Sequence, residues 1–196
     1  GKEARFVNGL RGTDEETMEI AEMVLSKVNK SLVAMVQELG VKAVGISGKD
    51  GGLLEVEKKY ANGEDIGYVG NITRVNTKLL EDLLENDFLP IVSPIGLDKN
   101  FDTYNINADS VAGAVAGALK ARRLLMLTDV AGILDREGSL VEHANADDIF
   151  RMKNDGTLTG GMIPKVDCCL AALEAGGEKM TIVDGRVENC VLLELL

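Results

Sequence analysis

The sequence lacks tryptophan and contains only three prolines and one histidine in 196 residues. Aromatic residues make up 4%, so aliphatic side chains must build the core, and a hydrophobic content of 45% is enough to form one. Glycine is plentiful by comparison, with 22 residues, which favours tight turns between strands and helices. These frequencies are typical of an α/β protein and argue against an all-β protein punctuated by prolines.

Basic residues are also scarce relative to acidic ones. The 21 lysines and arginines face 32 aspartates and glutamates, and the formal net charge is −11. This balance excludes a broad basic face that binds nucleic acid, although helix N-termini and a few cations can still bind an anion locally. No apolar run approaches the roughly 20 residues of a membrane span, and we recognise no signal peptide. We expect neither nucleic acid nor a membrane as a partner.

The three cysteines are Cys168, Cys169 and Cys190. Their odd number and spacing do not fit a disulfide framework, so we expect a reducing compartment, with Cys168 and Cys169 as packing residues of an apolar helix. The single histidine, His143, leaves no cluster of cysteine and histidine for a metal, and we expect no metal site and no tightly bound cofactor. Neither a P-loop nor a dinucleotide-binding glycine motif follows a predicted strand.

Apolar runs alternate with helical patterns along the chain. Four runs without polar alternation predict central parallel strands, at 42–47, 89–95, 124–128 and 179–183. Helical spacing predicts helices over 13–39, 77–87, 108–119, 144–156 and 160–177, the first opened by a capping box of Thr13 and Glu16. We predict a three-layer αβα sandwich with a mainly parallel central sheet, plus a small β-hairpin insertion over 53–76.

Ligands of open α/β sheets bind beyond the carboxyl ends of the strands. Polar residues follow each predicted strand, namely Lys49 and Asp50, then Asn105, Asn107 and Asp109, then Asp129, and finally Asp184 and Arg186. If the stretch YNINADS is extended, the side chains of Asn105, Asn107 and Asp109 share one side and could line a site. Alternatively, Asn107 or Asp109 caps the helix that follows.

Two cations, Lys165 and Arg11, lie at positions where they could bind an anionic ligand. Lys165 lies at a predicted helix start in GGMIPK, where its charge opposes the helix dipole unless a phosphate or carboxylate is near. We expect Asp109 to pair with a lysine that the fold brings in, and Lys165 is the candidate. Arg11 precedes the first helix and could clamp a carboxylate. For both cations the alternative is a solvated surface side chain.

Several motifs together resemble a known family. NGLRGTDEET, AVGISGKDG, YNINADSVAG, LLMLTDVAGIL, GTLTGGMIPKV and IVDGRVEN follow one another along essentially the whole chain as in the acetylglutamate kinases, which have the amino acid kinase fold. PKVDCCL and DGRVEN look most similar to the cyanobacterial and plastid branch. The resemblance implies ATP-dependent phosphorylation of the side-chain carboxylate of N-acetyl-L-glutamate in arginine biosynthesis, with ATP as its Mg²⁺ complex. It also implies a cytoplasmic enzyme, or a stromal one in a photosynthetic eukaryote.

The resemblance implies roles for the matching residues. Lys165 would be catalytic, stabilising charge on the transferring phosphoryl group, and Asp109 would hold the catalytic lysines in place. Arg11 and Asn105 would bind acetylglutamate, and Asn107 would line the same site. The nucleotide pocket would be lined by Asp129, Val130, Ala131, Gly132, Ile133, Leu134, Thr157, Leu158 and Thr159. We expect one kinase domain over 1–196, with acetylglutamate on the 1–110 side and nucleotide on the 111–196 side.

The chain also departs from the family. The family's Lys-x-Gly-Gly segment, which supplies a second lysine, and its C-terminal end are missing, so we expect a fragment incomplete at both ends, whose own activity is in doubt. The alternatives are a kinase for glutamate, aspartate, carbamate or UMP, or a catalytically dead fragment that only binds nucleotide or a PII-type regulator. The resemblance further implies a homo-oligomer: a dimer, or a hexamer if the family's N-terminal helix is present.

Overall fold

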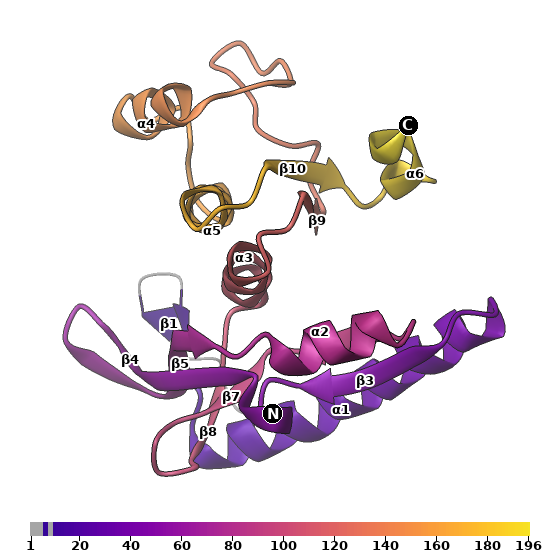
Figure 1. The fold of residues 1–196 in the computed structure, drawn as a ribbon. Coiled ribbons are helices and arrows are strands. Elements are labelled where there is room, and N and C mark those ends of the chain that lie inside the picture. Colours follow the sequence, from indigo (N-terminus) through magenta and orange to yellow (C-terminus); the bar gives the residue numbers. More distant parts are fainter. Residues whose placement is uncertain (1–5, 8–9) are drawn as a thin grey trace. The chain divides into compact units, whose positions relative to one another are not determined.

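The computed structural model describes residues 6–7 and 10–196, with residues 6, 7, 10 and 11 described by their backbone alone. The elements follow one another as β1 (Phe6–Val7), β2 (Leu10–Arg11), α1 (Glu15–Glu38), β3 (Ala43–Ser47), η1 (Asp50–Gly52), β4 (Leu54–Ala61), β5 (Glu64–Val75), α2 (Lys78–Glu85), β6 (Leu89–Ser93), β7 (Ile95–Leu97), β8 (Thr103–Asn105), α3 (Ala108–Ala118), β9 (Arg123–Thr128), α4 (Ala146–Asn154), α5 (Met162–Glu174), β10 (Lys179–Asp184) and α6 (Cys190–Leu195) (Figure 1). The chain divides within α3 into two compact units, Gly1–Val111 and Ala112–Leu196. Among the described helices, none combines the length and the apolar character needed to cross a membrane.

In the first unit, β3 and β6 form a parallel pair, in register from Ala43 opposite Leu89 to Ser47 opposite Ser93. Helix α1 packs against both strands, and α2 packs against β6. Both strands were predicted from their apolar runs, although the second run divides at Pro94 into β6 and the short strand β7. The pairing brings the carboxyl ends of β3 and β6 to one edge, as expected of parallel strands.

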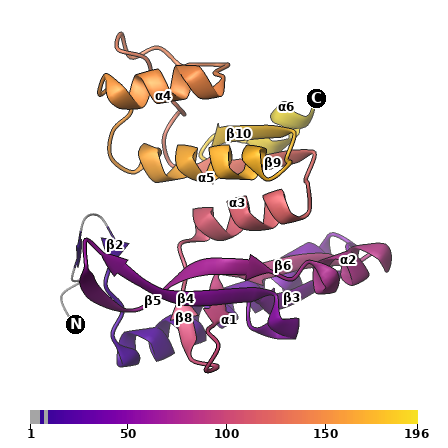
Figure 2. The ribbon, with the colours of Figure 1, turned by 60° about the vertical axis from the view of Figure 1, so that its left-hand side comes forward.

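The predicted hairpin forms as β4 and β5, which pair antiparallel around the turn at Asn62 and Gly63. It is not an isolated insertion. The order β4-β5-β8-β7 closes into a small barrel, in which β5 also pairs parallel with β8 and β4 with β7. Among these strands, Figure 2 labels β4, β5 and β8. Closure depends on close backbone approach, because a Cβ added to Gly96 of β7 would lie 3.0 Å from the Leu54 carbonyl oxygen of β4. The hairpin is therefore part of the barrel, and its strand β5 pairs directly with β8.

The predicted capping box of Thr13 and Glu16 is wrong, because the N-cap of α1 is Asp14. Its Oδ1 accepts a hydrogen bond from the Thr17 N–H at 2.8 Å. Thr13 is buried, with 3% of its surface exposed, and its backbone pairs with β5: its N–H donates to the Ile66 carbonyl at 2.9 Å. A Cβ on Gly67 would lie 2.1 Å from the Thr13 carbonyl oxygen. The barrel thus engages the backbone of Thr13, and the helix starts after it.

In the second unit, β9 and β10 form another parallel pair, in register from Arg123 opposite Lys179 to Thr128 opposite Asp184. Helix α5 packs against β10. A core cluster is formed by Ile149 of α4, Val166 of α5 and Leu158 from the segment that connects the two helices. The prediction of a mainly parallel sheet is met in part: the fold is mixed α/β, and the strands predicted to be central form two separate parallel pairs, β3–β6 and β9–β10, rather than one continuous sheet.

One buried polar side chain ties α1 to the first parallel pair. Asn29 is 5% exposed, and its Nδ2 donates to the carbonyl oxygens of Ile46 at 3.2 Å and Ile91 at 2.7 Å, one on each strand. Its Oδ1 has no hydrogen-bond partner among the described residues. The side chain fits because Gly45 leaves room, since an added Cβ there would lie 1.9 Å from Oδ1. Asn29 therefore sets how closely α1 packs on the sheet.

We predict that Gly45→Ala and Asn29→Ala each destabilise the chain, by about 2 kcal/mol, the first through overpacking and the second by leaving two carbonyls without their donor. The double variant should lose at least about 1 kcal/mol less than the sum, because removing the Asn29 amide makes room for the new methyl group. Urea unfolding of the four proteins measures this. Strict additivity would show that the two side chains do not share the space.

Candidate functional site

Asn105 and Asn107 lie where β8 leads into α3. Asn105 ends β8, half-buried, opposite Ile95 of β7 and Val69 of β5. Asn107 is exposed, and its Oδ1 accepts from the Ser110 backbone N–H at 3.0 Å and from the Ser110 hydroxyl at 3.3 Å. Asn107 therefore caps the first turn of α3, as one of the two sequence interpretations held.

The idea that Asn105, Asn107 and Asp109 point to one side of an extended segment is wrong. The strand stops at Asn105 and the helix starts at Ala108, so Asp109 lies in the first turn of α3. The N-cap bond from the Ser110 N–H to Asn107 favours a helix start at Ala108, because it satisfies a free N–H of the first turn. The three polar side chains still gather within one short strand–helix junction of the first unit.

The polar residues after β3 have partners of their own. Asp50 closes the turn after the strand, and its Oδ2 accepts from the Ser47 N–H at 2.6 Å and the Ser47 hydroxyl at 2.9 Å. Lys49 forms an ion pair with Glu22 of α1 at 2.8 Å. These contacts give both residues structural roles: Asp50 stabilises the turn, and Lys49 attaches the turn to α1.

In the second unit, the loop after β9 carries the first predicted nucleotide-lining segment, 129–134. Its beginning, Asp129 to Ala131, is exposed, whereas Gly132 is buried with φ +137°. A Cβ on Gly132 would lie 2.8 Å from Cδ1 of Leu140. The loop folds back on itself, since Leu134 bridges Leu140 and the Val141 N–H donates to the Ile133 carbonyl at 2.8 Å.

The second predicted segment, Thr157 to Thr159, connects α4 to the start of α5. Leu158 is 4% exposed and belongs to the core cluster, against which the half-buried Ile133 also packs. The two segments predicted to line the nucleotide pocket therefore meet on one hydrophobic cluster. The side chain of Leu158 faces that cluster, so a nucleotide would have to meet its backbone.

Lys165 lies in the second unit, three residues after α5 begins at Met162, and it is half-buried. The first turn of α5 contains no acidic residue, so the N-terminal end of this helix keeps its partial positive charge. Asp109 belongs to the first unit, and its pairing with Lys165 stays a prediction. Arg11 lies in β2, opposite Phe6 of β1, and its side chain is outside the described residues.

A bidentate ion pair stands at the carboxyl end of β10. Arg186 Nε donates to Oδ1 of Asp184 and Nη2 donates to Oδ2, both at 2.8 Å. The backbone N–H of Arg186 also donates to Oδ1, at 3.0 Å. These bonds lower the pKa of Asp184 to about 2. The same pair raises the pKa of Arg186, and the nearby charge of Asp129 adds to that effect. The strand ends of β9 and β10 thus share one electrostatic environment.

We predict that Arg186→Ala raises the pKa of Asp184 from about 2 towards the usual 3.8, which carboxyl-carbon NMR titration measures. The folded pKa lies below the unfolded one, so the pair stabilises the fold above roughly pH 4, and that contribution is lost as the pH falls towards 2. Arg151→Ala, which removes an exposed arginine from α4, should leave the titration unchanged. An unshifted Asp184 midpoint in Arg186→Ala would contradict the assignment.

Comparison with known proteins identifies the family. Residues 1–184 match the model of the amino acid kinase family. The acetylglutamate kinase of Nitratidesulfovibrio vulgaris (strain DP4) is 54% identical over 204 residues, which covers 99% of this chain and 66% of the relative. That of Oleidesulfovibrio alaskensis is 54% identical over 200 residues, covering 97% and 68%. The chain thus spans about two thirds of the length of these relatives.

A solved structure supports the same assignment of the fold. The N-acetylglutamate synthase of Neisseria gonorrhoeae, complexed with coenzyme A and N-acetyl-glutamate, matches 100% of this chain and 45% of its own chain, with a TM-score of 0.89 and 26% identity. The fold, the family match and the identity to the two kinases agree with the motifs recognised in the sequence. The chain belongs to the amino acid kinase family and, within it, to the acetylglutamate kinases.

Proposed function

We propose that the protein transfers the γ-phosphoryl group of ATP to the side-chain carboxylate of N-acetyl-L-glutamate, forming N-acetyl-L-glutamyl 5-phosphate in arginine biosynthesis. The observation that carries this proposal is 54% identity to two acetylglutamate kinases over nearly the whole chain. Kinases for glutamate, aspartate, carbamate or UMP, and a chain that only binds nucleotide, have no comparable support. ATP enters as its Mg²⁺ complex, which is a substrate.

The acetylglutamate side is proposed to lie in residues 1–110. Arg11 would clamp a carboxylate of the substrate through two parallel N–H···O bonds. Asn105 would contribute its side-chain amide from the end of β8. The Oδ1 of Asn107 already accepts the helix-capping bonds from Ser110, so its Nδ2 would be the group that donates to the substrate.

The nucleotide side is proposed to lie in residues 111–196. The loop Asp129 to Leu134 and the segment Thr157 to Thr159 would hold ATP, largely through backbone groups. This proposal is supported by the packing of both segments on the same core cluster. The cluster holds side by side two segments that are distant in the sequence.

Phosphoryl transfer requires positioning and charge neutralisation more than covalent participation of the protein. A carboxylate oxygen of acetylglutamate would attack the γ-phosphorus, the bond from that phosphorus to the bridging oxygen would break, and ADP would leave with the electron pair. The ammonium of Lys165 would neutralise charge on the transferring group, reinforced by the N-terminal end of α5. Asp109 would orient the lysine.

The larger arrangement is also proposed rather than observed. In the three-layer sandwich expected from the sequence, the pairs β3–β6 and β9–β10 would be parts of one central sheet within a single kinase domain over 1–196. We place the protein in the cytoplasm or plastid stroma, and the odd number and the spacing of the cysteines, which do not fit a disulfide framework, support a reducing compartment. A PII-type regulator as partner is supported only by the motifs shared with the photosynthetic branch.

A homo-oligomer is supported by an apolar face of α1. Seven large apolar side chains, six on this helix and one at its C-cap, are at least 43% exposed, namely Ile20, Met23, Val24, Val28, Leu32, Met35 and Leu39. They recur at helical spacing and form a stripe beside the side that carries Met18 and Asn29 into the core. The helix is about 36 Å long, and a standard interface buries about 800 Å² per partner, which such a stripe and its neighbours can supply. We propose a second copy of this chain as the occupant.

Steady-state assays of the full-length protein test the reaction. We predict turnover with N-acetyl-L-glutamate and none with glutamate, aspartate, carbamate or UMP. Lys165→Ala should lower kcat by about 10²–10³ while the KM for acetylglutamate changes little, because the lost interaction forms in the transition state. Lys153→Ala, which removes an ion pair to Asp167, is the matched control. Equal losses in kcat and substrate binding would remove Lys165 from this role, and ATP binding without turnover of any acceptor would favour the binding-only alternative.

Sedimentation equilibrium tests the oligomer. Met35→Lys should weaken self-association at least about tenfold, because it buries an unpaired charge in the apolar face of α1. Glu19→Lys changes the charge on another side of the same helix and should leave association unchanged. A parent protein that stays monomeric, or a Met35→Lys variant that associates like the parent, would contradict the proposed interface.

A further inference from the structure

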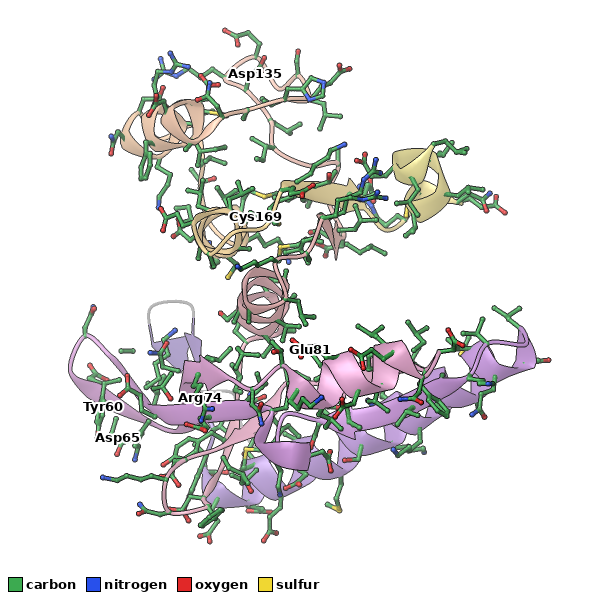
Figure 3. All side chains as sticks on the ribbon, in the orientation of Figure 1. Tyr60, Asp65, Arg74, Glu81, Asp135 and Cys169 are labelled. Carbon is green, nitrogen blue, oxygen red and sulfur yellow. The ribbon has the colours of Figure 1, made fainter. Side chains whose placement is uncertain are left out.

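The turn that follows the first nucleotide-lining segment is rigidly built. The Asp135 N–H donates to the Ser139 carbonyl at 2.9 Å, and Oδ1 of Asp135 accepts from the N–H groups of Glu137 at 3.0 Å and Ser139 at 2.8 Å. Gly138 completes the turn with φ +81°. Figure 3 shows Asp135 in this loop. The turn holds the backbone of Arg136 at a defined place, although the side chain itself is largely exposed.

Arg136 reaches from this turn to the other predicted segment. Its Nε donates to the Thr157 hydroxyl at 3.3 Å, and its Nη2 donates to the Asp155 carbonyl at 3.3 Å and lies 3.0 Å from the Asp155 carboxylate. Asp155 is the C-cap of α4, where a cation is favoured by the helix dipole. One guanidinium thus contacts two residues at the entrance to the Thr157–Thr159 segment.

Asp155 and Thr157 are also joined to each other. The Thr157 hydroxyl donates to Asp155 Oδ1 at 2.5 Å, and the Thr157 N–H donates to the same oxygen at 3.0 Å. These two bonds, followed by the charge of Arg136, lower the pKa of Asp155. The single proton of the Thr157 hydroxyl is engaged by Asp155, and the hydroxyl oxygen accepts from Arg136. Thr157 is thereby oriented from both sides.

The same segment leads directly to the helix that carries Lys165. The Met162 N–H donates to the Thr159 carbonyl at 3.3 Å, and the Ile163 N–H donates to the Gly160 carbonyl at 3.3 Å. A shift of Thr157 would therefore be passed to the first turn of α5. The polar contacts of Arg136 involve no residue of 129–134. They are therefore a second connection between the two segments, in addition to the packing of Ile133 against the cluster that contains Leu158.

We propose that Arg136 is a positioning residue of the nucleotide site, which ties the loop after β9 to the Thr157–Thr159 segment so that both sides of the bound nucleotide keep their spacing. This inference rests on the proposed function of those two segments. Arg136 acts through Asp155 and Thr157 and does not itself contact the phosphates. Its loss therefore weakens binding of the whole nucleotide, including its uncharged part.

Hydrogen exchange of the ligand-free chain tests the tie directly. In Arg136→Ala, the amides of Thr157, Leu158 and Val141 should exchange about two- to fivefold faster, the range expected for an exposed ion pair that restrains local opening. Arg136→Lys should restore part of the protection. Arg151→Ala, which removes another exposed arginine pair from α4, should leave these amides unchanged. Unchanged exchange in Arg136→Ala would overturn the proposal.

Binding of adenosine and of ATP tests the consequence. Arg136→Ala should weaken both to the same extent, about two- to fivefold, and Asp155→Asn should act in the same direction, while the KM for acetylglutamate does not change. A loss confined to ATP, with Asp155→Asn unaffected, would mean that Arg136 binds phosphate directly and would overturn the proposal. A wild-type protein that binds neither ligand would contradict the proposed function instead, and the exchange measurement would still decide whether Arg136 joins the two segments.

Discussion

Parallel pairing of strands determines where the polar residues of this chain are displayed. The β3–β6 and β9–β10 pairs each bring two strand ends to one edge, and residues with polar side chains follow β3, β9 and β10. In the second unit this places Asp129, after β9, within electrostatic reach of Arg186, after β10. The spacing of the two strands, rather than any sequence neighbourhood, creates that environment.

Close backbone approach is the second constraint, and glycine makes it possible at a few positions. Gly67 lets β5 reach the Thr13 carbonyl, and Gly45 leaves the space that Asn29 fills. A side chain at either position would force apart elements whose contacts define the first unit. In the second unit Gly113 has the same effect, because a Cβ there would lie 2.8 Å from the Cys168 carbonyl oxygen. The tight packing of α3 on α5 therefore depends on a residue without a side chain.

A net charge of −11 does not prevent a few cations from binding the proposed anionic substrate locally. Ion pairs hold several cations at defined places: Arg186 by Asp184 in the second unit, and Lys58 by Asp65 and Arg74 by Glu55 on the hairpin, where Figure 3 labels Asp65 and Arg74. Exposed pairs of this kind add little stability, about 0–1 kcal/mol each. They do restrict where a guanidinium or ammonium can lie. For a ligand site, this restriction is more important than the small gain in stability.

The sequence by itself determined the apolar strands, the hairpin, the helices and the family, because hydrophobic periodicity and ordered motifs are local properties that one chain carries in full. Only the tertiary structure decided that Asp14 caps α1, since the barrel engages the neighbouring Thr13. It likewise decided that β7 and β8 close the barrel and that Arg136 meets Thr157 across 21 residues. Such short strands and distant contacts leave no periodic signal, because they depend on which backbones and side chains the fold brings within hydrogen-bonding distance.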